Sequence, residues 1–174
     1  MTKLTEYETA WVLGGAERVA LTVFIAMAAA GQLEVGFKRQ RVKEGEAPLM
    51  SAEGTAALRI ETAALELLPE SGLPIDEFIT RLAGRPAIKT LDEGVSRPRV
   101  LSRFSPLHRE LRAENPTGVR RVAVLGVAGI EDERLREIFE HPLPGVPKFA
   151  GVHPVRDNTF DGTIGPTPGI LYGP

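Results

Sequence analysis

The sequence contains no cysteine and only three histidines, and both shortages limit the chemistry that the protein can perform. Without cysteine there are no disulfides, no thiol catalysis and no thiolate-bound zinc or iron–sulfur cluster. The histidines His108, His141 and His153 are isolated in sequence, so a catalytic or metal site would need partners delivered from elsewhere in the chain. We therefore expect no catalytic residue, no metal site and no cofactor.

The chain also lacks a strong net charge and a long apolar run. Its formal net charge is -2, so no overall basic field attracts nucleic acid or anionic lipid. The longest apolar stretches, 19–30 and 122–130, are shorter than the roughly 20 residues that a membrane span needs. The first residues carry no apolar run beside a cleavage site, which is unlike a signal peptide. These features predict a cytoplasmic protein with no membrane partner.

What the chain does contain is an ordinary globular composition, with 43% hydrophobic and 25% charged residues. A length of 174 residues suits one domain or two small packed modules. The patterns predict a mainly α fold, with a winged-helix-like module over 1–70, a second small helical module over 71–141 and an irregular tail over 142–174. The tail holds seven prolines and six glycines.

The first module reads as helix, turn, helix and basic hairpin. Thr5 and Glu8 have the spacing of a capping box, and Gly14-Gly15 ends the helix that they start. A second helix is predicted over 16–30, and alternating residues over 32–37 predict a half-buried strand. The spacing further predicts a third helix that opens at Ser51 and runs to about Leu68. This is the layout of a helix-turn-helix with a wing, formed by two helices and a β-hairpin.

The second module is predicted to consist of short helices. Pro74 suits the first position of a helix that ends at Gly84, and a shorter helix follows from Arg85-Pro86 to Gly94. The apolar run 122–130 fits a strand or a helix, and we favour a helix. Its preferred N-terminal cap is Asn115-Pro116, and an acidic helix follows over 131–140.

The second helix of the first module has an apolar outward face in this interpretation. A helix that reads base edges in the major groove needs Arg, Lys, Asn or Gln at its outward positions. Leu21 and Ile25 stand there instead, next to Thr22 and Ala29. We therefore expect Leu21 and Ile25 to pack on another helix, within this chain or in a partner protein.

Two basic stretches allow different interpretations. At the hairpin, Arg39 and Arg41 are suited to phosphate contacts, but basic side chains also protect an edge strand from pairing, and we favour the second explanation. The stretch 97–121 is rich in arginine, including Arg97, Arg99 and Arg103. It fits the binding of phosphate or an acidic peptide, and equally fits pairing with the acidic segment that follows.

The tail carries more apolar side chains than a purely solvating segment requires, among them Ile170, Leu171 and Tyr172. Spaced among prolines, such residues can dock in extended form in a groove of the body or of a partner. An unstructured end is the simpler alternative.

The opening motif Leu4-x-x-Tyr7-Glu8-x-Ala10-Trp11-x-x-Gly14-Gly15-x-x-Arg18-Val19, continued by Ala30-Gly31-x-Leu33, resembles a family of uncharacterised actinobacterial proteins. The resemblance is clearest over 4–33 and extends over 51–83. It implies an N-terminal winged-helix-like region and a glycine-rich tail. It also implies genes that lie beside those of multinuclear non-heme iron oxidases that modify peptides. No catalytic residue is implied.

These observations favour a non-catalytic interaction or adaptor protein that presents a peptide substrate to a neighbouring peptide-modifying enzyme, or stabilises that enzyme. The partner-binding candidates are Leu21, Ile25, Arg39, Arg41, Arg97, Arg99, Arg103, Ile170, Leu171 and Tyr172. The alternative is a winged-helix transcriptional regulator that binds nucleic acid through the wing and the arginines of 97–121. An enzyme whose site is assembled from scattered groups is a third and weaker alternative, and the oligomeric state is left open.

Overall fold

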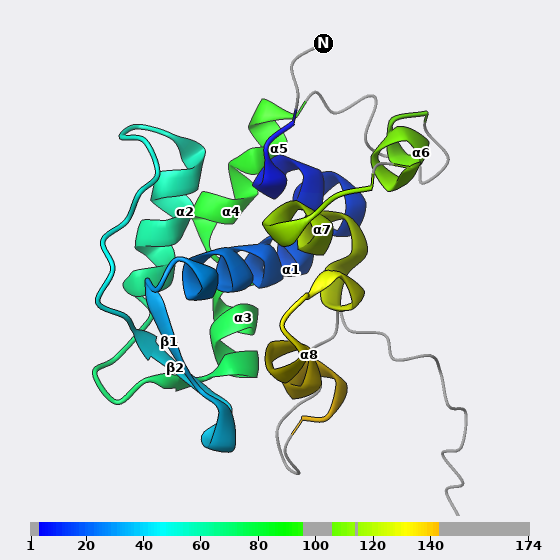
Figure 1. Cartoon of the computed structure of the whole chain (residues 1–174). Coiled ribbons are helices and arrows are strands. Elements are labelled where there is room, and N and C mark those ends of the chain that lie inside the picture. Colours follow the sequence, from blue (N-terminus) through cyan, green and yellow to red (C-terminus); the bar gives the residue numbers. More distant parts are fainter. Residues whose placement is uncertain (1–3, 96–105, 114, 143–174) are drawn as a thin grey trace, which may run out of the picture.

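The computed structural model describes residues 4–95, 106–113 and 115–142. The fold is mainly helical with a small three-stranded antiparallel sheet, as the sequence predicts at this level. The long helix α1 (Glu6–Ala29) runs through the centre, and the other elements pack around it (Figure 1). Its Phe24 side chain contacts the rings of Phe78 and Phe139 from two later helices, with centroids 6.2 and 5.9 Å away.

Helix α1 begins where the sequence predicts, but the helix end predicted at Gly14-Gly15 is a kink within one longer helix. Thr5 caps it with the full capping box, because its hydroxyl accepts from the Glu8 N–H and the Glu8 carboxylate accepts from the Thr5 N–H. Gly15 has a left-handed φ of 68° and kinks the helix, so that two helical segments meet there. A side chain at Gly15 would be strained in this conformation. Gly31, with φ of 75°, follows the end of the second segment.

The predicted hairpin is present. Strand β1 (Leu33–Gly36) pairs antiparallel with β2 (Arg41–Glu44), and a 3₁₀ turn, η1 (Phe37–Arg39), joins them. Strand β3 (Leu73–Pro74) adds to the far side of β2. The sheet order is therefore β1-β2-β3, with β1 at one edge.

Several predicted helix boundaries need correction. Helix α2 (Ala56–Leu65) is capped by Thr55 and does not open at Ser51. Pro74 belongs to β3 and precedes α3 (Ile75–Ala83), because pairing with β2 extends its backbone. The predicted helix over 85–94 is divided at Thr90 into two short helices, which are α4 (Pro86–Lys89) and α5 (Leu91–Gly94).

The last described helices are α6 (Pro106–Ala113), α7 (Gly118–Leu125) and α8 (Glu133–Glu140). The helical interpretation of the run 122–130 is confirmed as far as Leu125, where Gly126 with φ of 69° ends α7 and η3 (Gly126–Gly129) begins. The predicted cap Asn115-Pro116 is wrong, since Thr117 precedes the helix. Leu135, Ile138 and Phe139 of α8 are buried.

The predicted boundary at about residue 70 stays a prediction. Residues on both sides of it contribute to one hydrophobic cluster around α1, and β3 pairs with the hairpin across it. The tail from residue 143 lies outside the described residues.

By length and composition, α1 is the one described helix that is long and apolar enough to cross a membrane. Half of its most apolar 18-residue window is buried inside the protein. A helix that is apolar on all sides also suits the core of a soluble protein, so this property decides nothing alone.

The close approach of η3 to α7 yields a stability prediction. A Cβ at Gly129 would overlap the carbonyl oxygen of Arg121 and lie 2.8 Å from the Val122 nitrogen. Because these neighbours are backbone atoms, Gly129→Ala should lower the free energy of unfolding by about 1–3 kcal/mol in urea denaturation. Gly84→Ala is the control, since its Cβ would meet Arg81 at an ordinary 3.5 Å. Equal effects of the two substitutions would show that the steric overlap at Gly129 does not cost stability.

Candidate functional site

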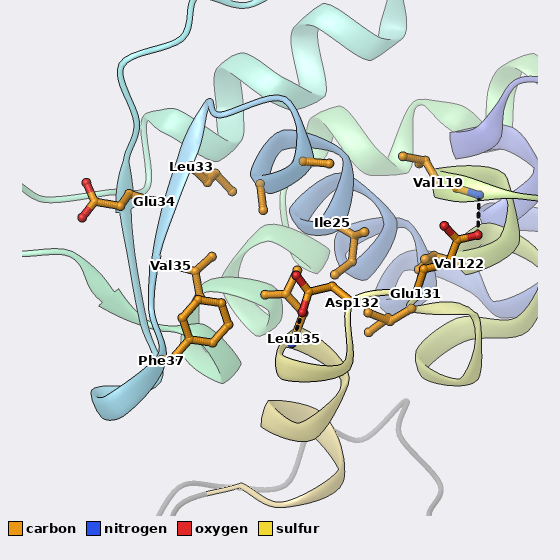
Figure 2. A pocket seen from close by; sticks show the side chains of 14 residues that line it. Ile25, Leu33, Glu34, Val35, Phe37, Val119, Val122, Glu131, Asp132 and Leu135 are labelled. Carbon is orange, nitrogen blue, oxygen red and sulfur yellow. Dashed lines mark hydrogen bonds between the residues drawn. The ribbon is translucent and has the colours of Figure 1, made fainter.

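A groove of about 500 Å³ lies between the hairpin and the helices around α1 (Figure 2). Strand β1 forms one wall, the C-terminal half of α1 forms the base, and the start of α7 with the segment leading into α8 forms the other wall. Its lining residues are mostly apolar: Ile25, Ala28, Ala29, Leu33, Val35, Phe37, Gly118, Val119, Val122, Ile130 and Leu135, together with Glu34, Glu131 and Asp132.

The alternation of side chains along β1 determines which of its residues line the groove. Successive side chains of a strand point to opposite faces. The Leu33, Val35 and Phe37 side chains therefore face the groove, while Glu34 points away from it (Figure 2). Leu33 is buried, whereas Val35 and Phe37 are half-buried. The wall thus leaves apolar surface within reach of a ligand.

The carboxylates that line the groove already have partners within the protein. Glu131 accepts from the Gly118 N–H at 2.9 Å, and Arg121 approaches it at 4.0 Å. Asp132 caps α8 by accepting from the N–H groups of Arg134 and Leu135. Glu34 pairs across the hairpin with Lys43 at 2.9 Å. Of the described residues that line the groove, none is Lys or Arg.

A smaller cavity of about 240 Å³ lies at the tip of the hairpin, and Phe37 lines both cavities. The Arg134 guanidinium of α8 stacks over the Phe37 ring at 3.9 Å. Close by, the Gln40 side chain donates to the carbonyl of His141 at 3.2 Å. These two contacts join the hairpin to α8 at this end.

The sequence places Leu21 and Ile25 on an outward face and leaves open whether they pack on this chain or on a partner protein, and the structure shows that they pack within this chain. Their exposed fractions are 2% and 7%, and Thr22 is fully buried. Helix α7 and the residues after it pack on this side of α1, so the apolar face contacts this chain's own helices. The sequence interpretation placed no later element there. Ile25 still contributes to the base of the groove.

The basic residues of the hairpin separate into two groups. Lys38 and Arg39 are exposed at the tip. Arg41 donates to the carbonyl of Gly72 in the turn before β3, and Lys43 pairs with Glu34. Arg41 therefore has a structural contact, which the sequence did not indicate.

The arginine-rich stretch is described only in part. Arg97, Arg99 and Arg103 lie outside the described residues, as do the tail candidates Ile170, Leu171 and Tyr172. Within the described part, Arg120 donates to the Leu4 carbonyl at 3.0 Å, and Arg121 approaches Glu131. These two side chains contact the protein itself.

Arg18, which the sequence analysis did not select, holds α7 against α1. Its Nη1 donates to the Val124 carbonyl at 2.8 Å, near the C-terminal end of α7. A cation is favoured there because the carbonyls at a helix C-terminus carry partial negative charge. Burial and the nearby Arg112 lower the pKa of Arg18 below its ordinary value. The sequence signal for it is its place in the opening motif, four residues after Gly14. In the structure, a Cβ at Gly14 would lie 2.8 Å from the Arg18 Nε.

A second polar group is buried between α1 and α2. The Tyr7 hydroxyl donates to Glu61 Oε1 at 2.9 Å, and the Ser51 hydroxyl donates to the same oxygen at 2.8 Å. Glu61 Oε2 has no hydrogen-bond partner among the described residues. Burial, followed by the charge of Glu61, raises the pKa of Tyr7 above its ordinary value. The phenol therefore stays protonated and joins α1 to α2.

Among the described residues there is no group of three or more His, Asp or Glu side chains placed to hold a metal ion. The comparisons with known proteins add no constraint: no family model, curated protein or solved structure gives a significant match to this chain. The actinobacterial family resemblance therefore stays a prediction.

The Tyr7–Glu61 hydrogen bond predicts a pH-dependent stability. Tyr7→Phe removes a buried donor to a carboxylate and should lower the free energy of unfolding by about 1–3 kcal/mol at pH 8. Because the folded protein holds the phenol proton more tightly than the unfolded chain does, this contribution is complete below about pH 10 and lost as the pH rises further. Urea denaturation of both proteins from pH 8 to 11 tests this. A stability difference that does not shrink above pH 10 would contradict it.

Proposed function

We propose that this protein is a non-catalytic adaptor that binds an apolar peptide segment of a partner protein in the groove beside β1. The observation that carries the proposal is the groove itself, with half-buried Val35, Phe37 and Val119 on its walls. Its volume lies within the range of about 300–1,000 Å³ that is usual for ligand pockets.

The state of the acidic groups supports binding in preference to catalysis. General acid–base catalysis needs a carboxylate or imidazole that is free to exchange a proton with the substrate. Each carboxylate that lines the groove already accepts a main-chain hydrogen bond or forms an ion pair. These groups hold the walls in place, and the apolar side chains between them offer the contact area.

We further infer that the two segments of α1 and the hairpin form a winged-helix-like module used for protein binding. In a DNA-reading module the second helix enters the major groove. Here the corresponding segment is buried, with Leu21 at 2% and Ile25 at 7% exposure, so it has no free face for base contacts. A cytoplasmic location and a peptide-modifying iron oxidase as the partner are further proposals, which rest on the sequence and the family resemblance.

Substitutions in the groove test the proposal. Val35→Glu and Val119→Glu each place a charge on a half-buried apolar wall, and each should reduce recovery of the partner from host extract at least tenfold. Met50→Glu is the matched control, because Met50 is apolar, 80% exposed and not part of the lining. Circular dichroism confirms that each variant is folded. Equal recovery with all three variants would exclude the groove as the binding site.

A nucleic-acid-binding regulator is the second candidate, and the exposed tip residues Lys38 and Arg39 favour it. If they contact phosphates, affinity for duplex DNA should fall steeply between 50 and 200 mM salt, and Arg39→Glu should weaken binding at least tenfold. Arg41→Glu is unsuitable as a test because Arg41 also holds the turn at Gly72. Fluorescence anisotropy measures the binding, and no affinity at low salt would exclude this candidate.

A further inference from the structure

We infer that the groove takes its peptide in extended form, as a fourth strand added to the edge of β1 that no described strand occupies. This inference rests on the proposed function and names the class of peptide that the groove binds. The sheet order places β1 at an edge, with β2 on its other side. The same strand forms one wall of the groove, so the sheet edge and the apolar surface adjoin.

The hydrogen-bond pattern of the hairpin shows which main-chain groups face this edge. The Gly45 N–H donates to the Gln32 carbonyl at 2.8 Å, and the register pairs Glu34 with Lys43 and Gly36 with Arg41. In an antiparallel pair, only alternate residues direct their N–H and C=O toward the partner strand. The main-chain N–H and C=O groups of Glu34 and Gly36 therefore point toward β2, and those of Leu33 and Val35 point away from it.

The pairing of β2 with β3, on its other side, is consistent with this alternation of main-chain groups. The Ile75 N–H donates to the Gln40 carbonyl at 2.9 Å, and Val42 pairs with Leu73 of β3. The main-chain N–H and C=O groups of even-numbered residues in β2 thus face β3, and those of odd-numbered residues face β1. The register of all three strands is therefore consistent, and the main-chain groups of Val35 lie on the outer edge.

The helices beside this edge provide the surface that an added strand would cover. Ala29 of α1 is exposed and Val119 of α7 is half-buried, and both line the groove beside the buried Ile25, Val122 and Leu135. Every second side chain of an added strand would face these residues, because strand side chains alternate. An edge of four residues offers few hydrogen bonds, so apolar contacts in the groove must contribute to affinity.

The charges of the lining favour a basic peptide. Glu131 and Asp132 are the carboxylates on the wall opposite β1, and none of the described lining residues is Lys or Arg. Complementary charges at an interface aid encounter and exclude like-charged partners. The occupant is therefore an extended segment of a partner protein with apolar residues at alternate positions and Lys or Arg between them.

The first test is selection of ligands from a library of random 12-residue peptides displayed on phage, with the full chain as target. The expected ligands have apolar residues at every second position, contain Lys or Arg, and bind Val35→Glu at least tenfold more weakly than Met50→Glu. Ligands with apolar residues at helical spacing that lose affinity for Val35→Glu would overturn strand addition but leave the proposed function intact. If no ligand distinguishes the two variants, the proposed function fails as well.

The second test measures amide hydrogen exchange by NMR with one selected peptide bound. Strand addition should slow exchange of the Val35 amide at least tenfold. The Glu34 amide is the control within the same strand, since it already faces β2, and its exchange should change much less. Equal changes at both amides would overturn the inference. So would a Val35 amide that is already protected in the free chain, because this chain's own tail or a second copy would then occupy the edge.

Discussion

The half-buried guanidinium of Arg18 joins the second half of the chain to the first, beside the apolar core that both halves share. It lies in α1 and donates to the Val124 carbonyl near the end of α7, more than a hundred positions later in the sequence. A charge of this kind is costly to bury unless carbonyl groups receive its hydrogen bonds. Gly14 and Gly126 leave the space for it, because a Cβ would lie 2.8 Å from the Arg18 Nε at Gly14 and 3.1 Å from the Arg18 Cζ at Gly126. The elements after α7, which are η3 and α8, lie where they complete the groove.

Local signals in the sequence predicted most elements near α1. The capping box at Thr5, the break at Gly14-Gly15 and the alternation of β1 depend on residues a few positions apart, so they are visible in one sequence. Boundaries such as the start of α2 were missed because Thr55, four residues after Ser51, is an equally good cap and Gly54 adopts a left-handed φ. Pro74 was misplaced because strand pairing with β2, a long-range contact, extended it.

The candidate site was harder to predict, since it depends on packing between distant segments. Leu21 and Ile25 appeared outward only because the position of α7 on α1 cannot be derived from periodicity. The sequence did predict the half-buried strand and the acidic helix that contribute Val35 and Leu135 to the groove. It did not indicate that these two elements face each other, or that Arg41 and Lys43 are engaged within the hairpin.

The contacts at the hairpin tip have a consequence for the thermodynamics of binding. Arg134 stacks on Phe37, and Gln40 reaches the main chain at the end of α8, so both sides of the groove are joined before any ligand arrives. A receptor whose binding groove is preorganised loses little conformational entropy on association. Most of the ordering cost then falls on the incoming segment, and stiffening that segment, for example by cyclisation as a hairpin, is the direct route to a tight ligand.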